Sequence, residues 1–154
     1  MLATGNTGRA RRRGRTRHQR GAAAVEFALV MLPLIALLLG TLQFGFYFFT
    51  TQSASSAARE TARRLVVGDC RGSGEAQSYA ASQANVLNLT LTYGTPGAGQ
   101  YDVTTGSVPD VGQTLRVKVQ ADGDIVHFIP LPGGGQVTRV VNARVEDDTA
   151  SASC

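Results

Sequence analysis

One uninterrupted apolar segment constrains this chain more than any other feature of its sequence. Residues 27–49 form a run of 23 residues that contains no Asp, Glu, Lys, Arg or His. As an α-helix this run would measure about 34 Å, enough to cross a hydrocarbon core of about 30 Å. We therefore predict a transmembrane helix over residues 22–49, followed by a domain with room for a modest core.

The basic residues gather ahead of this segment. Seven of the 15 Lys and Arg residues are arginines that precede Gly21, and no acidic residue lies among them. Basic flanks of a span stay in the cytoplasm. We therefore predict a basic cytoplasmic leader at 1–21, disordered over 1–20, and a domain at 50–154 outside the cytoplasm. The leader's position beside a span favours membrane lipid over nucleic acid as its partner.

The predicted helix does not end at the membrane. Small and apolar residues continue on one helical face: Ala54, Ala58, Thr61 and Leu65. Glu60 and Arg64 are spaced for an i,i+4 ion pair, and Gly68 with Asp69 gives a stop signal. One continuous helix of about 45 residues is predicted, apolar in its first half and amphipathic in its second.

The rest of the chain predicts a small α+β body. Residues 75–89 read as a second helix, or as part helix and part irregular chain. Alternation with period two then predicts strands at 89–93, 115–121, 125–131 and 137–147, with a short one at 101–104. The Asp-Gly-Asp turn signal at 122–124 predicts a hairpin between 115–121 and 125–131. The fold class is thus α+β: a long N-terminal helix packed on a small antiparallel sheet.

A single carboxylate, Glu26, stands at the start of the span. A charge at the centre of a span costs roughly 2.5–3.5 kcal/mol, but Glu26 follows Arg20 by only six residues and lies near the expected interface. In the simplest interpretation it reaches water or is protonated. In a second interpretation, a peptidase cuts after Gly21 and leaves Ala22 as the new N-terminus.

The second interpretation gives Glu26 a partner. Ala22 and Glu26 share one helical face, so the new ammonium and the carboxylate would offset each other's desolvation. Pairing between neighbouring chains would then set the register of packed helices.

Three stretches resemble one family. They are the basic leader ending in Gly21, AVEFALVMLPLIALLLG at 24–40 and AARETAR at 57–63, and they resemble the TadE-like proteins, minor pilins or pseudopilins of tight-adherence (Flp) pili. Residues 113–148 resemble the family's terminal strands more loosely. The resemblance implies a pilin-like fold, processing by a prepilin peptidase at Gly21, and Glu26 as the assembly carboxylate. It also implies other pilin-like subunits and pilus assembly proteins as partners, and a role in pilus assembly rather than catalysis.

The two cysteines, Cys70 and Cys154, are expected to pair if the domain lies outside the cytoplasm. The bridge would close a loop of about 85 residues, worth on the order of 4.6 kcal/mol in the chain-entropy model. Two unpaired thiols are the alternative. A metal site is not expected from two cysteines so far apart.

Three other functions compete with a pilus role. An enzyme would have to use His127, the one histidine after the leader, and no phosphate-binding loop is present; Asp122 and Asp124 fit a solvated turn better than a cation site. No cofactor is expected. A secreted binding protein would be cut near residues 53–55, although the span is long for a signal peptide. The remaining alternative is an uncleaved, single-pass membrane anchor for an extracytoplasmic binding domain.

Overall fold

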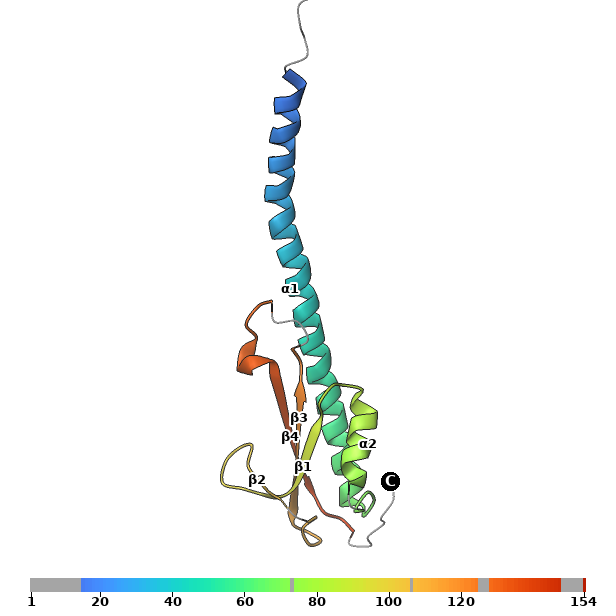
Figure 1. Cartoon of the computed structure of the whole chain (residues 1–154). Coiled ribbons are helices and arrows are strands. Elements are labelled where there is room, and N and C mark those ends of the chain that lie inside the picture. The colour runs from blue at the N-terminus through green and yellow to red at the C-terminus, as the bar shows by residue number, and fades with distance from the viewer. Residues whose placement is uncertain (1–14, 73, 106, 125–127, 148–153) are drawn as a thin grey trace, which may run out of the picture. The chain divides into compact units, whose positions relative to one another are not determined.

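The computed structural model describes residues 15–72, 74–105, 107–124, 128–147 and 154. The chain divides into two compact units, Met1–Leu39 and Gly40–Cys154, and each is considered by itself. The elements in chain order (Figure 1) are α1 (Arg15–Val66), α2 (Glu75–Ala84), β1 (Thr90–Pro96), β2 (Val103–Thr105), β3 (Thr114–Asp122), the 3₁₀ turn η1 (Pro132–Gly135) and β4 (Gln136–Arg144). The α+β class expected from the sequence is confirmed.

The described part of the first unit is helical throughout. Helix α1 begins at Arg15, so the prediction of disorder is wrong for residues 15–20. The physical reason is that a helix extends more easily than it nucleates, and Arg, Gln and Ala are all strong helix formers. Pro33 lies inside α1 without ending it, as membrane helices tolerate.

The end of α1 is set by a glycine, as predicted. Gly68 has a left-handed backbone with φ of 94°, which glycine adopts without a Cβ penalty. The amide of Gly68 donates to the carbonyl of Leu65 at 3.4 Å, and that of Asp69 to the carbonyl of Arg64 at 3.0 Å. This pair of bonds is a Schellman motif, and it satisfies carbonyls that a helix end would otherwise leave without partners.

The four strands form one antiparallel sheet in the order β2-β1-β3-β4. Strand β3 is central, and Val117 faces Tyr93 of β1 on one side and Val141 of β4 on the other. The predicted hairpin is wrong. Residues 128–131 are not in a strand, residues 125–127 lie outside the described part, and β3 pairs with β4 instead. The connection between them crosses η1, where Gly133 and Gly134 have positive φ.

The core of the second unit lies between one face of this sheet and the second half of α1. The predicted helical face is confirmed, because Ala54, Ala58, Thr61 and Leu65 are all fully buried. They share one cluster with the inner side chains of the sheet, such as Leu115, Val117 and Val119. Small residues on the helix let its backbone approach the sheet closely. The hydroxyl of Thr61 is buried without a hydrogen-bond partner among the described residues.

Helix α2 covers only the first part of the segment 75–89 for which the sequence predicted helix. It ends at Ala84, because Asn85 turns left-handed with φ of 48°. The helix over the whole of 75–89 is therefore wrong, and the alternative of part helix and part irregular chain is confirmed. Its buried residues are Ala76, Ala80 and Ala84, whereas Gln83 in the helix and Leu87 after it are exposed. Tyr79 alone contributes a large side chain to the core from this helix.

Candidate processing and assembly segment

Gly21 has no structural reason to be a glycine within the described residues. It lies inside α1, where glycine costs about 1 kcal/mol relative to alanine. Its φ is not positive, and a Cβ added there would meet no atom within 4 Å. Neither backbone conformation nor close packing among the described residues therefore accounts for a glycine at this position.

Ala22 and Glu26 follow on consecutive turns of the same helix. Both side chains are exposed, and their spacing of four residues places them on one face. Glu26 has no hydrogen-bond or ion-pair partner among the side chains that the structure describes. Among the described residues the carboxylate thus lies exposed at the border of an apolar helix.

The helix after Glu26 presents large apolar side chains on every side. One helix of the described residues is long and apolar enough to cross a membrane. The exposed apolar residues in the part of α1 that belongs to the first unit include Phe27, Leu29, Val30, Leu32, Leu37 and Leu38. Such a surface has no polar face to turn toward water, which is typical of a segment surrounded by lipid.

Sequence reasoning missed the role of Gln43. Its side chain is only 2% exposed because the connection between β3 and β4 packs on it. Gln43 Nε2 donates to the carbonyl of Ile129 at 2.7 Å and to Asp124 Oδ1 at 3.2 Å, and the amide of Ile129 donates to Gln43 Oε1 at 2.9 Å. Gln43 is the one side-chain amide in the uncharged run 27–49, which marks it as unusual in the sequence. Its partner Ile129 lies 86 residues away, so the sequence did not indicate the contact.

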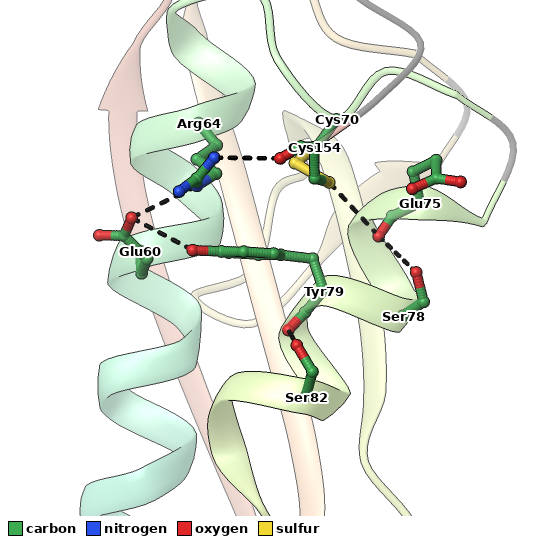
Figure 2. The surroundings of a disulfide bond; sticks show 8 residues. All are labelled: Glu60, Arg64, Cys70, Glu75, Ser78, Tyr79, Ser82 and Cys154. Carbon is green, nitrogen blue, oxygen red and sulfur yellow. Dashed lines mark hydrogen bonds and ion pairs between the residues drawn. A yellow bond between two sulfur atoms is a disulfide. The ribbon is translucent and has the colours of Figure 1, made fainter.

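At the other end of the second unit, Cys70 and Cys154 form a disulfide with an S–S distance of 2.05 Å (Figure 2). Cys70 is fully buried and follows the end of α1. The bridge ties Cys154 beside the start of α2, where its sulfur also lies 3.7 Å from the carbonyl oxygen of Glu75. Formation of the bridge in cells stays a prediction.

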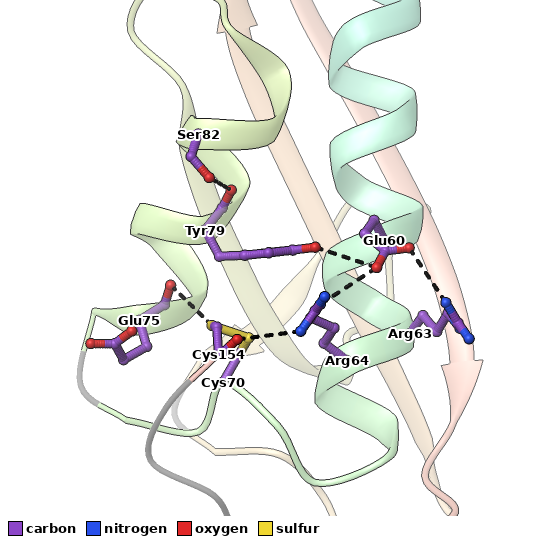
Figure 3. A network of polar contacts seen from close by, with 8 residues as sticks. All are labelled: Glu60, Arg63, Arg64, Cys70, Glu75, Tyr79, Ser82 and Cys154. Carbon is purple, nitrogen blue, oxygen red and sulfur yellow. Dashed lines mark hydrogen bonds and ion pairs between the residues drawn. A yellow bond between two sulfur atoms is a disulfide. The ribbon is translucent and has the colours of Figure 1, made fainter.

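A polar network lies beside the bridge and joins α1 to α2 (Figure 3). Arg64 Nε lies 3.4 Å from Glu60 Oε1, as the i,i+4 spacing predicted. The guanidinium stacks on the Tyr79 ring at 4.6 Å from its centroid, and the Tyr79 hydroxyl donates to Glu60 Oε1 at 3.3 Å. Hydrogen bonding with Tyr79 raises the pKa of Arg64, and Glu60 adds to this effect. The network is a structural tie that leaves Arg64 charged.

The residues weighed for catalysis are not assembled into a site. Asp122 accepts a hydrogen bond from Asn88 at 2.9 Å, whereas Asp124 accepts one from Gln43, so each carboxylate has its own structural partner. No group of three or more His, Cys, Asp or Glu residues that could hold a metal occurs in the described part of the chain. His127 lies outside the described residues.

Comparison with known proteins identifies the N-terminal segment. Residues 21–63 match the family model described as TadE-like protein. The segment is TadE-like. The family indicated by the sequence resemblance is thereby confirmed for this region, and the match begins at Gly21 and ends in the TadE-like AARETAR motif. It does not extend to residues 113–148. No curated protein and no solved structure matches the chain.

Proposed function

We propose that this chain is a minor pilin or pseudopilin of a tight-adherence pilus, anchored by a single membrane span and processed after Gly21 by a prepilin peptidase. The arginine leader is cytoplasmic and the second unit is extracytoplasmic. The protein acts as a structural or assembly component together with other pilin-like subunits, and it performs no catalysis.

The main support for this proposal is that Gly21 and Glu26 occur five residues apart at the start of the apolar helix. A helix-interior glycine without a packing role fits a peptidase that needs an extended, unobstructed backbone at the membrane surface. Cleavage there creates an ammonium on Ala22, four residues before a carboxylate that has no partner within the described chain. Both residues fall in the TadE-like segment. A charge pair between neighbouring helices offsets the cost of keeping each group near lipid.

Cleavage near residues 53–55, as in a secreted protein, is disfavoured by packing. Ala54 lies in the interior of α1 and is fully buried in the core of the second unit. A cut there would remove the start of the helical face that covers the sheet.

The first experiment follows processing of Gly21→Val in the native host. The bulkier side chain blocks the peptidase, so mass spectrometry of the membrane fraction should find the full leader attached. Gly45→Val is the matched control, because Gly45 lies in the same helix and a Cβ there also meets no atom within 4 Å. Normal cleavage of Gly21→Val would show that processing does not depend on Gly21 and would overturn the proposed site. An uncleaved parent chain would instead support the uncleaved membrane anchor.

The second experiment separates insertion from assembly with Glu26→Ala and Glu26→Gln. Removing a charge from the border of a span leaves insertion intact or slightly improved. Association with pilin-like neighbours and pilus formation should fail in both variants, since neither can pair with the Ala22 ammonium. Full piliation by both would show that Glu26 is only an interfacial carboxylate.

The third experiment tests topology. A reporter that is active only outside the cytoplasm is fused after Cys154. The excess of arginine in the leader predicts an active fusion. A stably expressed but inactive fusion would reverse the proposed orientation.

A further inference from the structure

The second unit has its own apolar surface, next to the connection between β3 and β4. Within residues 40–49 of α1 and in that connection, the exposed large apolar side chains are Leu42, Phe44, Phe46, Phe48, Phe49 and Phe128. The connection itself contributes Phe128, which is 47% exposed, and the exposed Pro130.

Two contacts show which residues of α1 lie beside this connection. A Cβ on Gly40 would lie 3.0 Å from Ile129 Cδ1, so glycine at this position makes room for the connection. Gln43, one turn later, holds both the amide and the carbonyl of Ile129. Residues 128–130 therefore lie beside residues 40–43 of α1 and not beyond the end of the apolar run.

Several backbone groups of the described residues 129–131 have hydrogen-bond partners within the protein. Lipid offers no hydrogen bonds, so each backbone polar group there needs a partner within the protein. The Gln43 amide supplies a donor and an acceptor to Ile129, Pro130 has no N–H, and the carbonyl of Leu131 accepts from Gly134 at 3.2 Å. At this level the exposed side chains of Phe128 and Pro130 are apolar, and the Asp124 carboxylate accepts a hydrogen bond from Gln43.

The length of α1 places this level in the membrane. A hydrocarbon core needs about 20 helical residues, and counting from Phe27, the first residue after Glu26, about 20 residues end at Phe46. We propose that Phe128 and Pro130 enter the outer leaflet beside α1, so that the second unit docks on the phospholipid interface at this connection. The proposal requires a membrane-anchored chain but neither processing at Gly21 nor entry into a pilus.

The distribution of the apolar residues favours lipid over a second protein chain. At 100° per residue, Leu42, Phe44, Phe46, Phe48 and Phe49 are spread over more than half of the helix circumference. The remaining side carries Gly40, Gln43 and Tyr47, which contact residues of the second unit. A protein partner buries one stripe of a helix, whereas a bilayer surrounds it, and both Leu and Phe side chains insert favourably into its apolar region.

The test uses the absence of tryptophan from the chain. Phe128→Trp introduces a single fluorescent probe into the full-length protein, reconstituted in vesicles of phosphatidylethanolamine and phosphatidylglycerol. Val111→Trp is the negative control, because Val111 is 50% exposed and lies near the far end of the sheet, where Gly112 pairs with Val145. Leu38→Trp, within the span, is the positive control. Quenching is compared in vesicles with and without lipid brominated along its acyl chains.

We expect bromolipid quenching at position 128 to approach that at position 38 and to exceed that at position 111 by at least about twofold. Quenching no stronger than at position 111 overturns the proposal. A blue-shifted emission at position 128 without bromolipid quenching also overturns it, since it indicates burial against a second copy or another subunit. Absence of quenching at position 38 would contradict the membrane span itself, and the proposal would then fail with it.

Discussion

The two halves of α1 have the same backbone but opposite surfaces. Residues 22–39 are rich in Leu, and nearly all of their large apolar side chains are exposed. Residues 50–66 are rich in Ala, Ser and Thr, and their buried positions recur on one face against the sheet. The large apolar side chains of residues 22–39 are thus mostly exposed, whereas the small ones of residues 50–66 are buried against the sheet.

This contrast shows that side-chain size and distribution, rather than hydrophobicity alone, distinguish a lipid-facing helix from a sheet-covering one. A helix in lipid needs no polar face and gains from large side chains all round. A helix on a sheet needs one narrow face of small residues, such as Ala54 and Ala58, and uses the other faces for charge. Glu60 and Arg63 are on those outer faces.

The largest expected effect comes from the disulfide, which belongs only to the sheet-covering half. Reduction should lower the free energy of unfolding of the second unit by about 4 kcal/mol, because Cys70 and Cys154 close a long loop. All four tyrosines lie between residues 47 and 101, so tyrosine fluorescence during urea unfolding in detergent reports on this unit. Helicity and membrane insertion of residues 22–39 should not change.

Thiol accessibility provides the control. Protein taken directly from cells should contain no alkylatable thiol without reductant and should migrate faster on a denaturing gel than the reduced form. Two alkylatable thiols would show that the bridge does not form in the cell.

The next effect contrasts two leucines. Leu65 is fully buried and Leu37 is 71% exposed. Leu65→Ala should destabilise the second unit by about 3 kcal/mol, through lost apolar contact and the cavity left behind. Leu37→Ala should change the same unfolding curve by less than about 0.5 kcal/mol. Equal effects at both positions would contradict the separation of the two halves.

A smaller effect, of opposite sign, is expected at Thr61. Its buried hydroxyl has no partner among the described residues, and an unsatisfied polar group lowers stability. Thr61→Val preserves the shape and removes the hydroxyl, so it should raise the free energy of unfolding by about 1 kcal/mol. Thr61→Ala, which also removes packing, should not stabilise. Loss of stability in the valine variant would point to a water or backbone partner for the hydroxyl.

The smallest effect compares the two glutamates of α1. Glu60 pairs with Arg64 with about a third of each side chain exposed to solvent, so Glu60→Gln should cost only about 0.5 kcal/mol, and less at high salt. Glu26→Gln should leave the unfolding of the second unit unchanged, because Glu26 lies in the first unit. A measurable change from Glu26→Gln would link the two units energetically.

Local patterns predicted much of this fold. The face of α1 that contains Ala54 and Leu65, the Gly68 stop and the alternation in β3 all depend on residues within a few turns or one strand. The TadE-like identity also depended on local runs. These features follow from helix and strand periodicity, which a single sequence displays directly.

Long-range contacts account for what the sequence did not predict. Residues 125–131 have the composition of a strand, yet Ile129 is held by a side chain 86 residues earlier and Pro130 lacks the N–H that a strand would use. Helix α2 buries alanines rather than Leu87 because Asn85 ends it early. In the candidate site, the sequence predicted that Ala22 and Glu26 share one helical face. It did not predict that a Cβ at Gly21 would meet no atom within 4 Å.

The disulfide also imposes a schedule on this protein. Its two cysteines are 84 residues apart in sequence, so at synthesis rates of about 5–20 residues per second, Cys70 emerges roughly 4–17 s before its partner. During that interval α2 and strands β1 to β3 are made, and β4 comes last among the strands. Because β4 ends at Arg144, before Cys154, the bridge can close only after all four strands have been synthesised.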